Sequence, residues 1–266
     1  MMITKKMKMI ELLSIDLSNY CTKQCPFCYN HSTKEGNVIW KPEEVIAFAK
    51  DCVAHGIKAV SLGGGEPFEY DGILDIIDAL QPICYLSVTT NGLPLVRPNG
   101  ISWETLREHA PDKVHVTLHN PDSEQELNRV MMEIRKLEKV VGVTAGCNLL
   151  VAASKIEASK KAYAALRRIL TPQQIIMVPM RYGDTPGLVK FASVSGHDPF
   201  QSPSCLLECK KPENFVSVSW DKKVNYCSYA GGKEQMLSLD YQGMMEALVL
   251  RVRMKPTFYI TRTLSV

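Results

Sequence analysis

Short runs of apolar and β-branched residues alternate with longer helical patterns along the first 190 residues. This alternation predicts parallel strands joined by right-handed crossover helices, and therefore an α/β fold. Six such units form a partial (βα)6 barrel, short of a complete eightfold barrel. The predicted strands are 12–17, 58–62, 85–90, 114–118, 143–152 and 175–179, and the predicted helices are 42–55, 71–80, 102–109, 123–139 and 156–170.

The alternating pattern ends near residue 190, where Gly187, Gly196, Pro199 and Pro203 mark a stretch rich in turns. Residues 215–220 and 223–229 then predict a β-hairpin, and 244–253 is compatible with a helix. We therefore expect two parts: a partial barrel over residues 1–190 and a small C-terminal extension over residues 191–266.

Composition narrows the class of protein only slightly. The chain has 266 residues, of which 45% are hydrophobic and 22% charged, so it belongs with globular proteins. The formal charge of +3 gives no argument for a polyanionic partner, and we do not expect nucleic acid to bind. The longest weakly polar run, 140–153, is too short to cross a bilayer, and no signal peptide is recognisable. A soluble, cytoplasmic protein is expected.

The nine cysteines are unusual for such a chain. An odd number of cysteines argues against a disulfide framework. Three of them, Cys52, Cys84 and Cys147, fall within apolar segments and are interpreted as small buried hydrophobic residues. The other six form two groups of three.

The first group, Cys21, Cys25 and Cys28, directly follows the first predicted strand. Its Cx3CxxC spacing allows one tight loop to bring three thiolates around a metal centre and to leave one metal position open, as a catalytic centre requires. The alternative is a zinc knuckle, for which His31 is the only nearby fourth ligand. The spacing favours an iron–sulfur cluster.

A second motif, Gly63-Gly64-Gly65-Glu66-Pro67, directly follows the second predicted strand. Glycines lack a Cβ, so a ligand can contact the backbone there. Glu66 offers an acceptor for an ammonium group. No Lys-Ser/Thr pair follows, and the acid would repel phosphate, so this is not a phosphate-binding loop.

Together these motifs resemble the radical S-adenosylmethionine (radical SAM) superfamily. The Cx3CxxC motif carries the aromatic Phe27 before its last cysteine, and Gly64-Gly65-Glu66 stands in the order of the family's GGE element. The resemblance covers residues 10–190. It implies a [4Fe–4S] cluster held by Cys21, Cys25 and Cys28, with SAM chelating the fourth iron.

The resemblance also implies a reaction. Reductive cleavage of SAM gives methionine and a 5′-deoxyadenosyl radical, which abstracts hydrogen from a peptide or small-molecule substrate, with a flavodoxin- or ferredoxin-type protein as electron donor. Two alternatives stay open at this point. One is cleavage to a 3-amino-3-carboxypropyl group, and the other is a non-enzymatic iron–sulfur or zinc module in redox transfer or sensing. Candidate substrate contacts follow the sixth strand: Arg181, Tyr182 and Asp184.

Polar residues end the third, fourth and fifth predicted strands. In folds of this kind ligands gather at the carboxyl ends of the strands. In the family, matching positions hold the methionine carboxylate, ribose and adenine of SAM, although His119 departs from the Asp that is common two residues later. For each of these residues except His119, the alternative is a local bond to backbone. The candidates are Thr90, Asn91, Thr117, His119 and Asn148.

The second cysteine group is Cys205, Cys209 and Cys227. It resembles the truncated auxiliary-cluster (Twitch, or half-SPASM) extension of some family members, such as the enzyme that rearranges GTP for molybdenum-cofactor synthesis. A full SPASM extension has seven cysteines, which this chain lacks. A second iron–sulfur cluster, a zinc site and no metal at all are the three interpretations.

Overall fold

The computed structural model describes residues 10–180, 193–196, 214–229 and 231–253, with side chains to residue 250. A single nine-stranded sheet organises them, in the order β6-β5-β4-β3-β2-β1-β7-β8-β9. The strands are β1 (Leu12–Asp16), β2 (Ala59–Gly63), β3 (Tyr85–Thr90), β4 (Lys113–Leu118), β5 (Thr144–Val151), β6 (Ile175–Pro179), β7 (Phe215–Val218), β8 (Lys223–Asn225) and β9 (Glu234–Gln235).

Strands β1 to β6 are parallel, and each of the first five is followed by a helix, as the sequence pattern predicts. The predicted partial (βα)6 barrel is therefore confirmed. The α-helices are α1 (Pro42–Ala54), α2 (Ile73–Leu80), α3 (Trp103–Glu108), α4 (Glu124–Leu137), α5 (Ile156–Leu166) and α8 (Tyr241–Arg253). Short 3-10 turns are η1 (Pro67–Glu69), η2 (Leu93–Leu95), η3 (Ala153–Lys155) and η4 (Pro172–Gln174).

Local chemistry sets the helix boundaries. Ser102 caps α3 by accepting a hydrogen bond from the Thr105 amide at 3.0 Å, which confirms the predicted cap. Ser123 caps α4 in the same way, through the Glu126 amide at 3.2 Å. Proline at the first position of α1 fits a site where no amide donor is needed.

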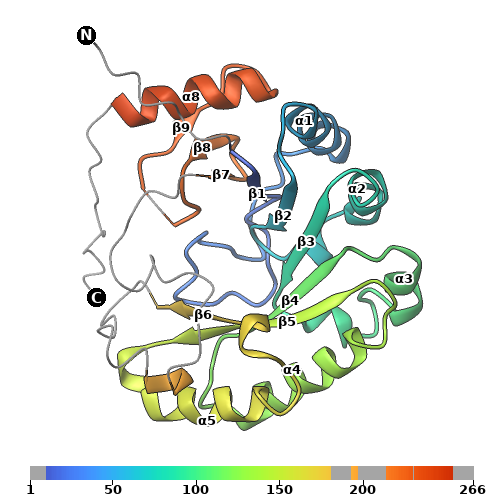
Figure 1. Cartoon of the computed structure of the whole chain (residues 1–266), viewed down its shortest axis with the longest axis vertical. Helices are drawn as coiled ribbons and strands as arrows, with labels where there is room; N and C mark the ends of the chain where they lie inside the picture. Colours follow the sequence, from blue (N-terminus) through green and yellow to red (C-terminus); the bar gives the residue numbers. More distant parts are fainter. Residues whose placement is uncertain (1–9, 181–192, 197–213, 230, 254–266) are drawn as a thin grey trace.

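The two faces of the curved sheet differ in polarity. Alternate strand residues such as Leu13, Ile15 and Val88 are fully buried in the hydrophobic core. Helices α1 to α5 lie on the outer side of the sheet, as Figure 1 shows. Residues between them in the strands, such as Ser14, Asp16 and Ser61, line a cavity on the concave side of the sheet. The fold therefore provides an apolar layer under the helices and a polar interior.

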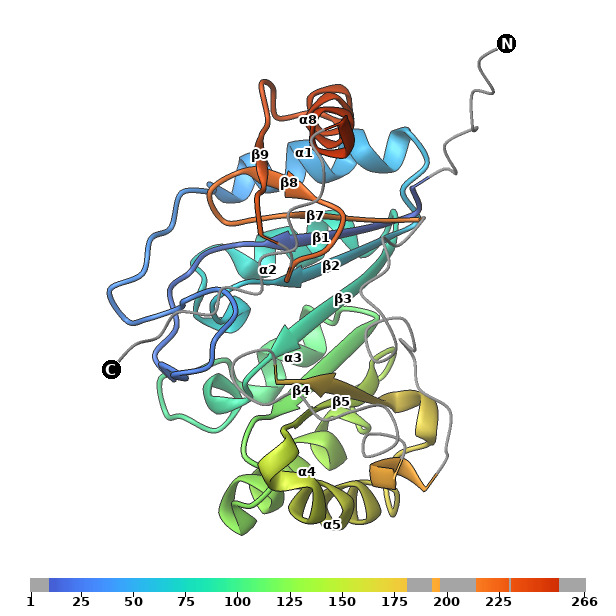
Figure 2. The same cartoon turned by 90° about the vertical axis from the view of Figure 1, so that its left-hand side faces the viewer.

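The C-terminal extension continues this sheet. β7 pairs with β1 in parallel, and β8 pairs with β7 in antiparallel fashion, so the predicted hairpin is present with shorter strands. Helix α8 lies beside α1 (Figure 2), where the Tyr241 amide donates to Asp51 Oδ2 at 2.7 Å. The division at residues 190 and 191 stays a prediction, while hydrogen bonding within the sheet joins segments from both sides of it.

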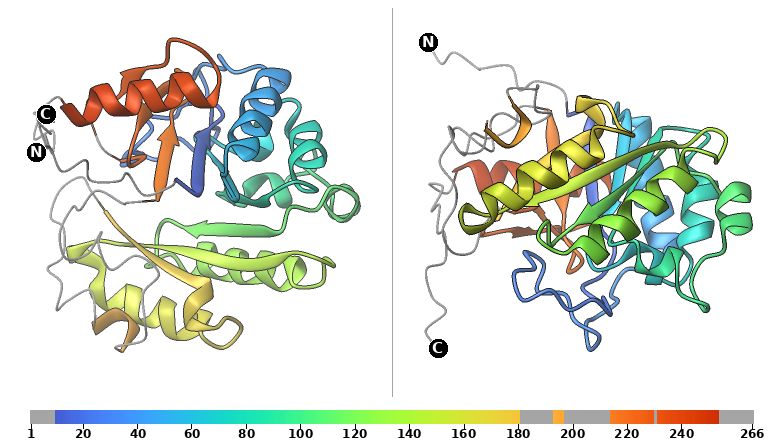
Figure 3. Two further views of the ribbon diagram at one scale, coloured as in Figure 1. Left: turned by 45° about the horizontal axis from the view of Figure 1, so that its top comes forward. Right: turned by 90° about the horizontal axis from the view of Figure 1, so that it is seen from below.

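The loop that follows β1 projects beyond one end of the sheet, where the strands have their carboxyl ends (Figures 2 and 3). This is the end at which ligands gather in parallel α/β folds. None of the helices in the described part of the chain has the length and apolar character needed to cross a membrane.

Candidate functional site

A cavity of about 470 Å³ opens at the carboxyl ends of the parallel strands. Its volume is within the usual range for cofactor and substrate sites. Eleven residues singled out from the sequence line it, and they come from the loops or strands at β1 to β5. These are Cys21, Cys25, Phe27, Cys28, Gly64, Gly65, Thr90, Asn91, Thr117, His119 and Asn148.

The three cysteines of the Cx3CxxC motif share this cavity because their loop folds back on itself. The Cys21 amide donates to Thr33 O at 2.8 Å, and the Cys28 amide donates to Cys25 O at 3.0 Å. His31, the zinc alternative, is exposed and is not part of the cavity wall. Among the described residues, no three His, Cys, Asp or Glu side chains converge for a single metal ion. A cubane cluster needs no such convergence, since each thiolate binds a different iron.

The glycine-rich segment after β2 packs directly on this loop. The Gly65 amide donates to Ser18 O at 2.7 Å, and a Cβ at Gly65 would collide with Tyr20 O. Gly64 has φ of +106°, and its Cβ would lie 2.7 Å from Ser18 O. Two of the glycines are therefore required by the close approach of two backbones. We call this segment, Gly63–Gly65, the glycine ledge.

Glu66 is buried directly behind the ledge and is not part of the cavity wall. Its Oε1 accepts from the Phe68 amide at 3.1 Å and from Thr90 Oγ1 at 2.7 Å, and its Oε2 accepts from the Asn91 amide at 2.7 Å. Burial raises the pKa of this carboxyl to about 7, although these three donors lower it. Glu66 thus ties the ledge to the end of β3, and its contact with an ammonium group stays a prediction.

Asn91 connects this clamp to the cysteines. Its side-chain amide donates to Cys21 Sγ at 3.5 Å, while its Oδ1 accepts from the Leu93 amide at 2.8 Å. Burial raises the pKa of the Cys21 thiol, and it raises that of Cys25 to about 11. Both thiols are therefore protonated in the metal-free protein, and a bound metal would displace these protons.

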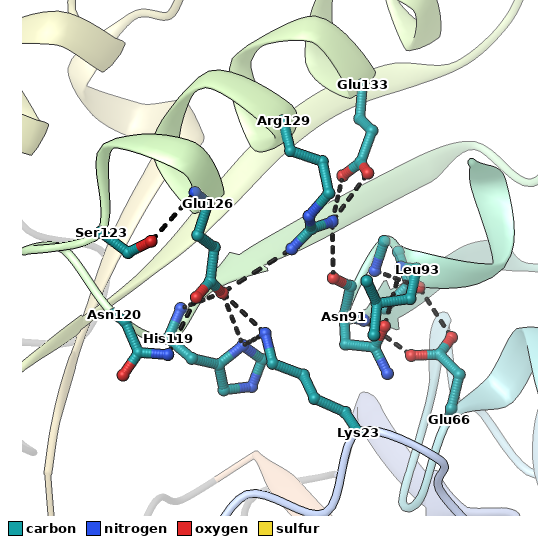
Figure 4. A network of polar contacts seen from close by, with 12 residues as sticks. Lys23, Glu66, Asn91, Leu93, His119, Asn120, Ser123, Glu126, Arg129 and Glu133 are labelled. Carbon is teal, nitrogen blue, oxygen red and sulfur yellow. Dashed lines mark hydrogen bonds and ion pairs between the residues drawn. The ribbon is translucent and has the colours of Figure 1, made fainter. Parts of the chain in front are cut away.

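A polar network ties the cysteine loop to α4 (Figure 4). Lys23 Nζ lies 2.6 Å from Glu126 Oε1 and 3.1 Å from His119 Nδ1. Glu126 also accepts from the His119 amide at 3.1 Å and from Asn120 Nδ2 at 2.9 Å. Partial burial alone would raise the pKa of Glu126, but these hydrogen bonds and the Lys23 charge together outweigh it and hold the pKa well below its usual value. The network therefore contains an ionised carboxylate.

The same network reaches the end of β3. Arg129 Nη1 donates to Asn91 O at 3.1 Å and to Glu133 Oε1 at 2.7 Å (Figure 4). Glu133 is fully buried, which raises its pKa to about 7 in spite of the arginine. The strand end that carries Asn91 is thus held from two sides, by Glu66 and by Arg129.

The fourth and fifth strands bring three more polar residues to the cavity or just behind it. Thr117 and Asn148 are register partners in β4 and β5. Asn148 Oδ1 lies 2.9 Å from Nδ1 of His115, whose pKa burial lowers to about 4. Neutral His115 can donate a hydrogen bond from Nδ1 to Asn148 Oδ1, so the NH2 group of Asn148 is not used in this contact. His119 lies with its ring 6.1 Å from that of Phe27.

Sequence reasoning missed several residues of the site. A period-two reading of the strands would have pointed to two of them: His115 stands two residues before the predicted Thr117, and Asp16 stands two residues after Ser14, which also lines the cavity. The remaining three belong to the network of Figure 4, whose partners are far apart in sequence. The missed residues are Asp16, Lys23, His115, Glu126 and Arg129.

Part of the predicted site lies outside the described residues. Cys227 is described and half-buried against the hydrophobic core, just after β8, and it is not part of the cavity wall. Cys52 and Cys147 are buried in the core, as expected, and Cys84 packs against it. The residues outside the described part are Cys205, Cys209, Arg181, Tyr182 and Asp184.

Comparisons with known proteins agree with this geometry. The model of the "Radical SAM superfamily" matches residues 15–147. A "Probable GTP 3',8-cyclase" of Sulfurisphaera tokodaii is 32% identical over 142 residues, which are 53% of this chain and 44% of the relative. The "GTP 3',8-cyclase" of Clostridium perfringens is 29% identical over 129 residues, which are 46% of this chain and 39% of that relative. The chain therefore spans less than half the length of these curated relatives.

Solved structures share the fold at low identity. Streptococcus suis SuiB bound to S-adenosylmethionine superposes with a TM-score of 0.64 at 15% identity, covering 85% of this chain and 63% of SuiB. The protein anSMEcpe with bound AdoMet gives a TM-score of 0.59 at 13% identity, covering 90% and 79%. At such identities the similarity concerns the fold alone.

Proposed function

Because this chain belongs to the radical SAM superfamily, we propose that it reductively cleaves SAM and abstracts hydrogen from a peptide or small-molecule substrate. Membership implies a [4Fe–4S] cluster and SAM as cofactors, and it makes the protein an enzyme, so the non-enzymatic module is no longer an alternative. The observation that carries the proposal is the shared cavity of the three cysteines, the glycine ledge and the polar strand ends.

The residues present fit these cofactors. Three thiols face one cavity, and burial raises the pKa values of Cys21 and Cys25, which suits ligands that lose their protons only to a metal. Cys21, Cys25 and Cys28 would hold the cluster, and the ledge would offer SAM its backbone. When bound, the reduced cluster supplies the electron that splits SAM into methionine and a 5′-deoxyadenosyl radical, the species that takes hydrogen from substrate.

The chain's own side chains orient this site. Asn91 donates to the Cys21 sulfur and would keep donating to it as a thiolate, where such a bond is stronger. Lys23 lowers the pKa of Cys25 through its charge and so favours the thiolate form there. Thr117 and Asn148 contribute hydrogen-bonding groups to the cavity wall and would bind the ribose or base of SAM.

A radical SAM enzyme requires an electron donor and a substrate. We propose a flavodoxin- or ferredoxin-type donor, because the cluster must be reduced before SAM is cleaved. GTP is the first substrate to test, since curated relatives carry the name GTP 3',8-cyclase. These relatives match over less than half of their own length, so GTP cyclisation is a second candidate function here.

Product analysis tests the main proposal. The protein is reconstituted anaerobically with iron and sulfide, reduced with dithionite and incubated with SAM. Release of 5′-deoxyadenosine is expected. Methylthioadenosine instead would indicate the 3-amino-3-carboxypropyl alternative, and no SAM cleavage would contradict both. Cys84→Ser is the matched control, because Cys84 lies outside the cavity wall and should retain activity.

We further propose a second cluster at Cys205, Cys209 and Cys227. A metal is one way to stabilise a small extension with little core of its own. Reconstituted protein would then contain about eight irons, because each cubane holds four. Replacing all three cysteines by Ala should reduce the iron content to about half. Wild-type protein with about four irons and no zinc would contradict the second cluster.

A further inference from the structure

Asp16 ends β1 at the point where the glycine ledge meets the hairpin of the C-terminal extension. Its side chain is 1% exposed, and the residue lines the cavity. Its register partner in β2 is Gly63, at which a Cβ would lie 3.6 Å from Asp16 Oδ1. Glycine at this position therefore places no side chain between the ledge and the carboxyl group of Asp16.

One oxygen of this buried carboxyl group lacks a hydrogen-bond partner. Asp16 Oδ1 accepts from the Tyr29 hydroxyl at 3.2 Å, whereas Oδ2 has no partner among the described residues. Burial raises the pKa of Asp16 to about 6, Lys233 and Tyr29 lower it, and Asp221 raises it. Lys233 acts only through space, because no ion pair joins it to Asp16 in the described structure. A buried acceptor without a donor is costly, and native proteins rarely keep one without a purpose.

The charges around Asp16 indicate which ligands suit the cavity. Among the described residues of its wall, Lys23 is the only Lys or Arg, and it is already bound to Glu126 at 2.6 Å. The pKa of His119 is lowered by burial, so its ring is neutral. A polyphosphate therefore finds no uncommitted cation in this part of the wall, while a cation finds the carboxylate of Asp16.

The surroundings of Asp16 also suit the carbon skeleton of an organic cation. Tyr29 packs edge-on against Tyr229 with ring centroids 4.7 Å apart, and Tyr229 and Phe215 line the same cavity. Aromatic side chains bury aliphatic and planar groups well and also attract cations. The carboxyl group thus stands beside an aromatic surface contributed in part by the C-terminal extension.

On the premise of the proposed function, we propose that Asp16 anchors the substrate through a protonated amine or guanidinium group that donates to Oδ2. The substrate class is then an amino or guanidino compound, free or as a Lys or Arg side chain of a peptide. SAM itself carries an ammonium group, so the experiment must separate SAM from substrate.

Binding to the reconstituted, SAM-saturated protein tests this proposal without turnover. The probes are propylammonium chloride, methylguanidinium chloride and GTP, at matched ionic strength, followed by thermal shift and calorimetry. At least one cation should bind the wild type, with about tenfold or greater loss of affinity in Asp16→Asn, the scale of one hydrogen bond to a charged group. Asp221→Asn is the matched control, since it removes a nearby acid outside the cavity wall.

Three results would overturn the proposal. The first is the absence of binding by both cations to the wild type, or equal binding to Asp16→Asn. The second is GTP binding that does not depend on Asp16. The third is a comparable loss of SAM affinity in Asp16→Asn, which would assign the carboxylate to SAM. Failure of the wild type to release 5′-deoxyadenosine would instead contradict the proposed function, and the probe-binding result would remain readable.

Discussion

The two sides of the cavity differ in how fully their carboxylates are hydrogen-bonded. On the side of β3, β4 and α4, both oxygens of Glu66 and both oxygens of Glu126 accept from protein donors. On the side of β1 and the hairpin, Asp16 has one partnered oxygen and one without a partner among the described residues.

This difference separates positioning from binding. A group whose hydrogen bonds are all made by the protein is held in place before any ligand arrives, as preorganised sites require. A buried acceptor with a missing donor gains most when a ligand supplies that donor. We therefore expect substitutions on the first side to affect folding and cofactor geometry, and substitution of Asp16 to affect ligand binding and pH dependence.

The largest effect is expected at the cysteines. Cys25→Ala should abolish SAM cleavage, because an incomplete set of thiolates cannot hold the cluster. The fold should remain, since Cys25 is half-buried in a loop outside the hydrophobic core. Circular dichroism checks the fold, and product analysis checks the cleavage. Retained cleavage in Cys25→Ala would remove this residue from the ligand set.

A large loss of stability is expected for Glu66→Ala. It would leave the Phe68 and Asn91 amides and the Thr90 hydroxyl without their acceptor. The free energy of unfolding should fall by about 4 kcal/mol, given about 1–3 kcal/mol for each unsatisfied buried group. If Glu66 also accepts from the SAM ammonium, SAM binding weakens by about 1.5–3 kcal/mol. If the variant loses stability but binds SAM with normal affinity, Glu66 only holds the end of β3 in place and does not contact SAM.

The fold was predictable because its signals are local. Apolar residues alternate in strands such as β3, which begins and ends at its predicted residues. Caps such as Ser102 determine where helices begin. The position of β7 beside β1 was not predictable, because that pairing joins residues about 200 positions apart and leaves no periodic signal in either strand.

The site was predictable only where its residues form a motif. The cysteines and the ledge stand at fixed spacings, but Lys23 and Glu126 meet only after folding, 103 residues apart. Glu126 stands three residues after the cap Ser123, as in a capping box. Its carboxylate accepts instead from the His119 amide and Asn120, so the sequence pattern indicates a helix start and gives no sign of the network.

The Asp16→Asn variant tests the difference between the two sides of the cavity through the pH dependence of stability. Because burial raises the folded-state pKa from 3.8 to about 6, the folded protein binds more protons than the unfolded chain between these values. The stability due to Asp16 is thus full below pH 4 and is lost as pH rises to about 6. Above that pH the apoprotein variant should be more stable than wild type by up to about 3 kcal/mol. The free energy of unfolding of both proteins is measured with urea across this pH range. If it depends on pH in the same way in the variant and the wild type, the carboxylate of Asp16 is not unpartnered in the folded protein.

The smallest effect is expected for Lys23→Met, which keeps the aliphatic stem and removes the charge. The loss of two partners, Glu126 and His119, should lower the free energy of unfolding by about 1–2 kcal/mol. Since Lys23 lowers the pKa of Cys25, the variant apoprotein should also alkylate more slowly at Cys25 at pH 8. Peptide-resolved mass spectrometry with iodoacetamide measures this rate, and Cys84 serves as the internal reference. If the alkylation rate of Cys25 is unchanged, Lys23 only connects the cysteine loop to α4 and does not affect the reactivity of Cys25.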